Sequence, residues 1–148
     1  AKILALDFVD SDLLIQKREG KTLQEIINDD GHMELRKIEE EVLMSITLHD
    51  HIIATGGSAP YSEKAMTHLK KSGITLFLHA ELDTLKSRID NYETRGLAKR
   101  PEQSFAHLFQ ERSTLYRKYA DITIKSDGQT QDQVCAEIVH QLNHLNLR

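Results

Sequence analysis

The chain of 148 residues is long enough for one domain, and its 39% of hydrophobic residues can form a sizeable core. A net charge of -4, built from interspersed acids and bases, excludes a basic face for nucleic acid and a polybasic segment for membranes. The single Cys135 and the scattered histidines predict neither a disulfide nor a metal site. No signal peptide or membrane span is recognisable, so we expect a cytoplasmic protein.

Short apolar runs alternate with longer stretches of helical periodicity, which is typical of a parallel sheet covered by helices. The apolar, β-branched runs suit strands that are buried on both faces. We expect strands at residues 6–9, 52–55, 74–78 and 122–124. We expect helices at residues 12–19, 23–28, 33–47, 62–71, 82–92, 104–119 and 131–146, with Cys135 in the core. No linker interrupts the alternation, so a single α/β domain over residues 1–148 is predicted.

Helix-end residues explain a stretch that otherwise looks like a phosphate-binding loop. Gly20-Lys21-Thr22 ends like the P-loop pattern G-x-x-x-x-G-K-[ST], but Ile15 stands where the first glycine belongs, and the preceding residues are helical. Gly20, Gly31 and Gly73 each follow a helical stretch as natural terminators, while Thr22 and Glu25 form a capping-box pattern. The stretch therefore indicates one helix end followed by one helix start.

Two carboxylates, Asp10 and Asp12, stand where the first apolar run ends and a polar helix begins. In open α/β sheets, ligands bind outside the carboxyl ends of the strands, which makes both acids candidates for metal or substrate contact. The alternative is that Asp12 only caps the following helix. A second strand end places Gly56 and Gly57 at the corresponding edge, where a backbone without Cβ can approach a ligand closely. A plain turn is the alternative there.

Four motifs occur in one order along the chain, and a fifth stretch, residues 119–124, continues the pattern. The motifs are Phe8-Val9-Asp10-Ser11-Asp12, Leu35-Arg36-Lys37-Ile38-Glu39, Ala54-Thr55-Gly56-Gly57 and Glu111-Arg112-Ser113-Thr114-Leu115-Tyr116. Together they resemble the shikimate kinases over essentially the whole chain. The resemblance implies a P-loop kinase fold, with a five-stranded parallel sheet between helices. It also implies phosphorylation of the 3-hydroxyl of shikimate by ATP with Mg²⁺, in chorismate and aromatic amino-acid biosynthesis, by a monomer.

The resemblance assigns roles to the acidic and basic residues of these motifs. Asp12 would hold a shikimate hydroxyl and act as base, and Asp10 would lie near Mg²⁺, through water. Arg36 and Arg112 would bind the substrate carboxylate, a task that suits the guanidinium fork. Glu39 would orient Arg36, although the two could also be an ordinary surface pair three residues apart on a helix.

The glycine loop departs from the family. Gly57 keeps the substrate-contact position, but Ser58 stands where the family usually has a third glycine, and Leu35 stands where it commonly has Phe. The acceptor could therefore be another small hydroxy acid.

A polar, cationic stretch over about residues 93–104 is expected to be the lid that closes over the phosphates. Arg95 matches the catalytic and ATP-binding lid arginine by its spacing from Arg112, whereas Arg100 lies too close. Arg88 fits the arginine that stacks on adenine. A basic connector between helices is the alternative for all three.

Residues 1–5 match the tail of the first helix of the family, so its first strand, its P-loop and most of that helix have no counterpart in the sequence. We expect an N-terminally incomplete chain, with a gap in the sheet and without kinase activity on its own. A different class of function is a non-catalytic ligand-sensing domain of a regulator. Retention of Asp12 favours the enzyme, and the sequence ahead of Ala1 would discriminate the two.

Overall fold

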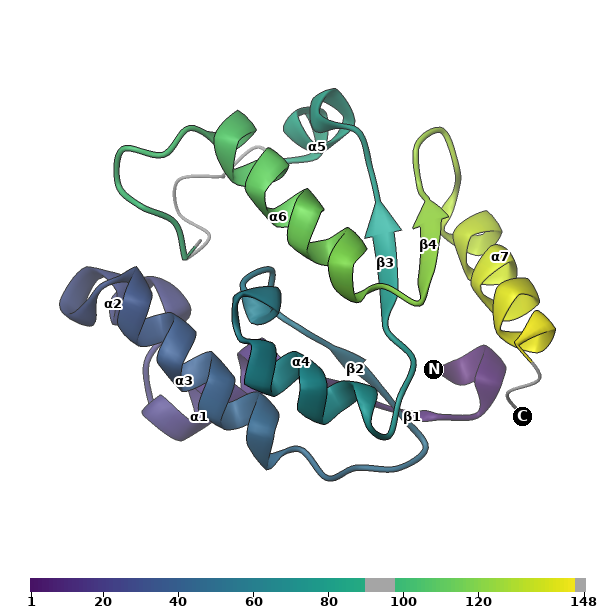
Figure 1. Cartoon of the computed structure of the whole chain (residues 1–148), viewed down its shortest axis with the longest axis horizontal. Helices are drawn as coiled ribbons and strands as arrows, with labels where there is room; N and C mark the ends of the chain where they lie inside the picture. Colours follow the sequence, from purple (N-terminus) through teal and green to yellow (C-terminus); the bar gives the residue numbers. More distant parts are fainter. Residues whose placement is uncertain (90–97, 146–148) are drawn as a thin grey trace.

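The computed structural model describes residues 1–89 and 98–145, and within them four strands form two parallel ladders (Figure 1). Strand β1 (Asp7–Asp10) pairs with β2 (His51–Ala54), with Phe8 opposite Ile52. Strand β3 (Leu76–His79) pairs with β4 (Ile122–Lys125). The two ladders are not hydrogen-bonded to each other within the described ranges.

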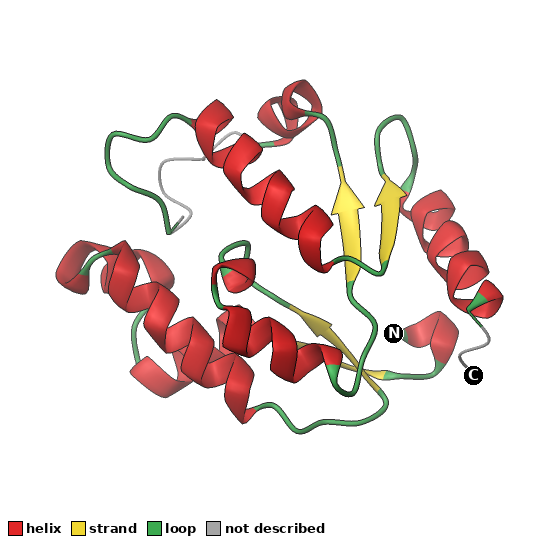
Figure 2. Ribbon diagram, in the orientation of Figure 1, coloured by secondary structure: helices red, strands yellow, loops and turns green. Residues whose placement is uncertain are grey.

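Helices flank both ladders, which confirms the predicted α/β class (Figure 2). They are α1 (Ser11–Glu19), α2 (Leu23–Asp30), α3 (His32–Ser45), α4 (Glu63–Lys70), α5 (Leu82–Arg88), α6 (Phe105–Tyr119) and α7 (Gln131–His144), with short 3₁₀ turns η1 (Lys2–Leu4) and η2 (Ala59–Tyr61). Helix α6 runs alongside β3, and α7 packs against β4 (Figure 1). The expected boundaries hold within two residues except in α5, whose helix ends at Arg88.

Local capping chemistry fixes the start of α1 and the turn that follows it. Asp10 is the N-cap of α1, because its Oδ1 accepts the backbone N–H of Asp12 at 2.9 Å. The capping alternative for Asp12 is therefore wrong. Gly20 ends α1 with a φ of 66°, a left-handed conformation that glycine adopts without strain. Thr22 and Glu25 make the predicted capping box, so this stretch is no phosphate loop.

Helix α3 is the centre of the core because its apolar residues enter two clusters. One contains Ile15, Ile26, Leu35, Ile38, Val42 and Ala98, and the other contains Leu43, Ile46, Ala59, Ala65 and Met66. Leu43 is fully buried, and burial of a side chain of this size contributes about 1.5–3 kcal/mol. The position of α3 is thereby fixed, and with it the position of every polar side chain that α3 carries toward the strand ends.

Three expectations are corrected. Cys135 is exposed rather than in the core, because the α7 helix packs on β4 with another side. Gly73 does not terminate α4, whose C-cap is Lys71. Phe8 and Leu78 are 59% and 52% exposed, so the described elements cover β1 and β3 only in part.

None of the described helices is long and apolar enough to cross a membrane.

Candidate functional site

A cavity of about 340 Å³ lies at the carboxyl ends of β1 and β2. The residues that follow these strands, Asp12 after β1 and Gly56 and Gly57 after β2, line it together with Glu39 of α3 and Arg112 of α6. Apolar side chains complete the wall: Ile15, Leu23, Leu35, Ile89 and Phe105. The two strand ends therefore meet at one edge, as their sequences predict.

Gly56 is the point where two carboxylates approach the backbone most closely. A Cβ on this residue would lie 2.4 Å from Oε1 of Glu39 and 2.6 Å from Oδ1 of Asp12. The backbone N–H of Gly56 donates to Oγ of Ser11 at 3.2 Å, which fixes the loop against the start of α1. Glycine at this position therefore leaves free the space that the two acids occupy.

Burial changes the acidity of both carboxyl groups. Burial raises the pKa of Asp12, and the nearby charge of Asp10 raises it further. Burial also raises the pKa of Glu39 to about 7, against the hydrogen bond that the Ser58 hydroxyl donates to its carboxylate. Near neutral pH, both the protonated and the ionised form of Glu39 are therefore populated. The raised pKa of Asp12 makes it a stronger base than an exposed aspartate.

Arg36 and Arg112 converge on one oxygen from two different helices. Nη2 of Arg36 and Nη2 of Arg112 each donate to the backbone carbonyl of Ala98 at 3.1 Å. The Nε atoms of both arginines are buried and have no hydrogen-bond partner in the described part of the chain. The site therefore holds two cationic groups with unused donors around one acceptor position.

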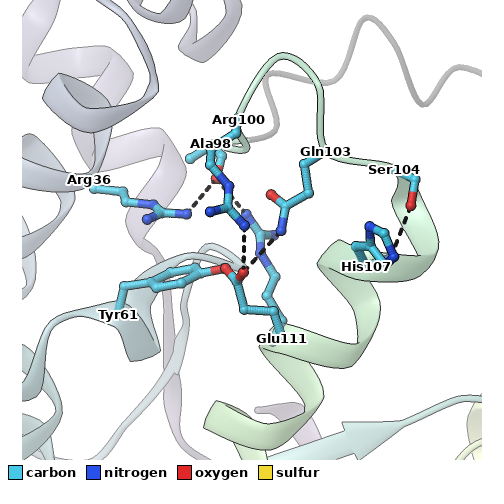
Figure 3. Close-up of polar contacts among 9 residues, drawn as sticks. Arg36, Tyr61, Ala98, Arg100, Gln103, Ser104, His107 and Glu111 are labelled. Carbon is cyan, nitrogen blue, oxygen red and sulfur yellow. Dashed lines mark hydrogen bonds and ion pairs between the residues drawn. The ribbon is translucent and has the colours of Figure 1, made fainter.

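Two tyrosines support these groups, and only one of them gave a signal in the sequence. Tyr116 donates through its hydroxyl to the carbonyl of Gly57 at 2.8 Å, and it follows Arg112 by four residues on the same side of α6. The ring of Tyr61 lies 3.5 Å from Cζ of Arg36 (Figure 3). Tyr61 ends a short 3₁₀ turn outside any helical or strand pattern, so no periodicity pointed to it.

Comparison with known proteins decides the family. The family model of shikimate kinase matches residues 1–143. The chain belongs to the shikimate kinase family. It is 35% identical to the shikimate kinase of Thermodesulfovibrio yellowstonii, over 99% of this chain and 86% of that protein. It is 33% identical to the shikimate kinase of Aquifex aeolicus, over 96% of this chain and 84% of that protein.

Solved structures agree with the sequence comparison. The shikimate kinase of Acinetobacter baumannii, solved in complex with shikimate, superimposes with a TM-score of 0.89 at 27% identity and covers 100% of this chain and 84% of that chain. The Aquifex aeolicus enzyme superimposes with a TM-score of 0.83 at 33% identity, over 99% of this chain and 86% of that chain. The fold is therefore the shikimate kinase fold.

The resemblance to shikimate kinases pairs Glu39 with Arg36, but the carboxylate of Glu39 has a different partner. This carboxylate accepts from the hydroxyl of Ser58, which stands where a third glycine is expected. No ion pair joins Glu39 to Arg36 in residues 1–89 and 98–145; Arg36 contacts the Tyr61 ring and the Ala98 carbonyl. A role of Glu39 in orienting Arg36 therefore stays a prediction.

Arg88, one of the two expected nucleotide-binding residues, is not among the residues that line the cavity. Arg88, at the end of α5, is exposed and donates to the carbonyl of Ser126 at 3.2 Å, beyond the carboxyl end of β4. Arg95 and residues 93–97 of the expected lid lie outside the described residues. In the rest of that segment, Arg100 donates to Glu111 at 3.2 Å, so it has a local ion pair.

One group with metal-ligand chemistry occurs among the described residues, away from Asp10. It consists of His79, Glu81 and Asp127, whose ligand atoms lie within 4.8 Å of one another. Nη2 of Arg117 is 3.3 Å from Nε2 of His79. The permanent positive charge of Arg117 at this distance repels a metal ion. When Arg117 donates an N–H to Nε2 of His79, the proton of the imidazole ring lies on Nδ1.

Proposed function

We propose that this protein binds shikimate in the cavity and phosphorylates its 3-hydroxyl with ATP. The observation that carries the proposal is the convergence of Arg36 and Arg112 on one oxygen, with both Nε donors buried and unpaired. A buried donor without a partner costs about 1–3 kcal/mol. A carboxylate brings two charged oxygens in place of the single Ala98 carbonyl, so it satisfies donors that the carbonyl leaves unpaired.

Asp12, which also lines the cavity, suits the acceptor hydroxyl. In the proposed reaction the hydroxyl oxygen attacks the γ-phosphorus of ATP, its proton passes to a carboxylate oxygen of Asp12, and ADP leaves. The raised pKa of Asp12 makes its carboxylate a better proton acceptor. The neighbouring Glu39, held by Ser58, limits the room around that hydroxyl and thereby supports selection of a small acceptor.

The proposal also includes the binding of ATP and Mg²⁺. Asp10 uses Oδ1 to cap α1, which leaves its second oxygen for a water molecule of Mg²⁺. Arg88 and Arg95 are proposed to bind the nucleotide, with residues 93–104 as the lid. The sequence contains no G-x-x-x-x-G-K-[ST] motif. We further propose a cytoplasmic, monomeric single domain.

Calorimetric titration with shikimate tests the proposal. Arg36→Lys and Arg112→Lys each replace a planar fork by a point charge, so the dissociation constant for shikimate should rise about tenfold or more. Arg18→Lys is the matched control, because Arg18 pairs with Glu41 on the surface, away from the cavity. Equal affinities of the wild type and both cavity variants would remove the carboxylate site.

A further inference from the structure

Tyr61 is the side chain against which the guanidinium of Arg36 packs. Cζ of Arg36 lies 3.5 Å from the centre of the Tyr61 ring (Figure 3). Cζ of Arg112 lies 6.0 Å from the same centre. A cation over an aromatic face is attracted by the electron-rich ring when it lies within about 6 Å. The short distance makes Arg36 the principal partner of the ring, with Arg112 at the limit of the interaction.

The hydroxyl of Tyr61 ties this ring to α6. It donates to Oε1 of Glu111, the residue that immediately precedes Arg112. Oε2 of Glu111 accepts from Nε2 of Gln103 at 3.0 Å and from Nη2 of Arg100 at 3.2 Å. One tyrosine therefore connects Arg36 of α3 with the helix that carries the second arginine, and Glu111 continues the connection to the segment before α6.

The proposed substrate competes for the second contact of Arg36. Nη2 of Arg36 donates to the Ala98 carbonyl, and a carboxylate bound between the two arginines would compete with that carbonyl for the donor. Within residues 1–89 and 98–145, the Tyr61 ring is the contact of Arg36 for which such a carboxylate does not compete. Burial and the bond to Glu111 raise the pKa of Tyr61, so its hydroxyl remains a donor across the physiological range.

We propose that Tyr61 is a positioning residue that holds Arg36 in its carboxylate-binding orientation and thereby gives the site its selectivity for an acidic acceptor. The proposal rests on the proposed function, because it needs the carboxylate between Arg36 and Arg112. The ring, rather than the hydroxyl, makes the contact with Arg36. Tyr61→Phe should therefore keep most of the affinity for shikimate, whereas Tyr61→Leu should raise the dissociation constant about tenfold.

The test compares shikimate with its methyl ester, which lacks the negative charge, by calorimetry on the whole chain. Tyr61→Leu should weaken binding of shikimate about tenfold and leave binding of the ester unchanged. In an Arg36→Gln background, Tyr61→Leu should have no further effect, because the residue through which it acts is gone. Tyr119→Leu is the control: Lys118 lies 4.9 Å from the Tyr119 ring, outside the cavity, and shikimate affinity should not change.

Equal weakening of acid and ester, or a full effect of Tyr61→Leu in the Arg36→Gln background, would show that Tyr61 is only structural and overturn the proposal. Thermal melts show whether each variant folds. If Tyr61→Leu does not fold, Tyr61→Met takes its place in the comparison of shikimate with its ester. A wild-type protein that binds shikimate without preferring it to the ester would overturn the carboxylate clamp itself, and the role of Tyr61 with it. Failure of the proposed function is thus separated from failure of the tyrosine proposal.

Discussion

Asp12 of α1 and Glu39 of α3 hold their carboxylates against the same glycine, Gly56, where a Cβ would lie 2.6 Å from the first and 2.4 Å from the second. Two carboxyl groups that share a buried site do not both ionise readily. Burial raises the pKa of both, that of Glu39 to about 7. In the proposed reaction Asp12 takes the proton of the acceptor, and Glu39 bonds Ser58 and shapes the space beside it.

Asp12→Asn tests the base. Asparagine keeps the size and one acceptor oxygen, but it removes the charge and the proton-accepting ability. We expect turnover to fall on the order of 100- to 10,000-fold, because this is the usual contribution of a general base. The capping bond to the N–H of residue 12 comes from Asp10, so the melting temperature should change little.

Turnover is read as shikimate-dependent ADP release by a protein that carries a P-loop, since the 148 residues contain no P-loop motif. Asp7→Asn, an exposed position at the start of β1, is the matched control. A variant at Asp12 that keeps its rate per folded molecule would show that Asp12 is not the base.

Gly56→Ala should impair the site more than the fold. The added methyl group meets the ends of two side chains, Glu39 and Asp12, which can rotate away at low cost to stability but then leave their working positions. Shikimate affinity should therefore fall while the free energy of unfolding changes little. Gly73→Ala, where a Cβ would lie an ordinary 3.4 Å from the carbonyl of Leu69, serves as control. A loss of stability without a loss of affinity would contradict the crowding at Gly56.

Glu39→Gln should change how stability depends on pH. The pKa of Glu39 is raised from its ordinary value of 4.5 to about 7, so the folded state binds the proton more tightly than the unfolded chain. The contribution of this group is fully present below pH about 4.5 and is lost as pH rises through about 7. A shift of this size corresponds to roughly 3 kcal/mol.

Urea unfolding of the wild type and of Glu39→Gln between pH 4 and 8 measures the difference, with Glu34→Gln, an acid that pairs with Lys37 on the surface of the same helix, as control. The glutamine variant should gain relative to the wild type as pH rises. Parallel curves would mean that Glu39 titrates normally.

The parts of this account that could be predicted from the sequence depend on local rules. The capping box of Thr22 and Glu25, and the placing of Asp12 and Gly56 at one edge of parallel strands, follow from spacing and topology. The contact of Tyr61 with Arg36 could not be predicted, because it depends on the angle at which η2 meets α3. Cys135 is exposed, against expectation, because helical periodicity shows which side of a helix is apolar but not which part of that side contacts the sheet.

The Ala98 carbonyl was equally beyond prediction. It reaches Arg36 and Arg112 across separations of 62 and 14 residues, and a backbone carbonyl carries no residue-type signal. The exposure of Phe8 and Leu78 has a similar cause, since an apolar strand sequence does not specify which neighbours cover it.

A crystal structure of the protein with shikimate tests the central claim most directly. We expect the carboxylate to lie between Arg36 and Arg112 at hydrogen-bond distances of about 3 Å, with the Ala98 carbonyl displaced and a hydroxyl on Asp12. Shikimate bound elsewhere, or bound with its carboxylate away from both arginines while the Ala98 carbonyl keeps its two hydrogen bonds, would contradict the account.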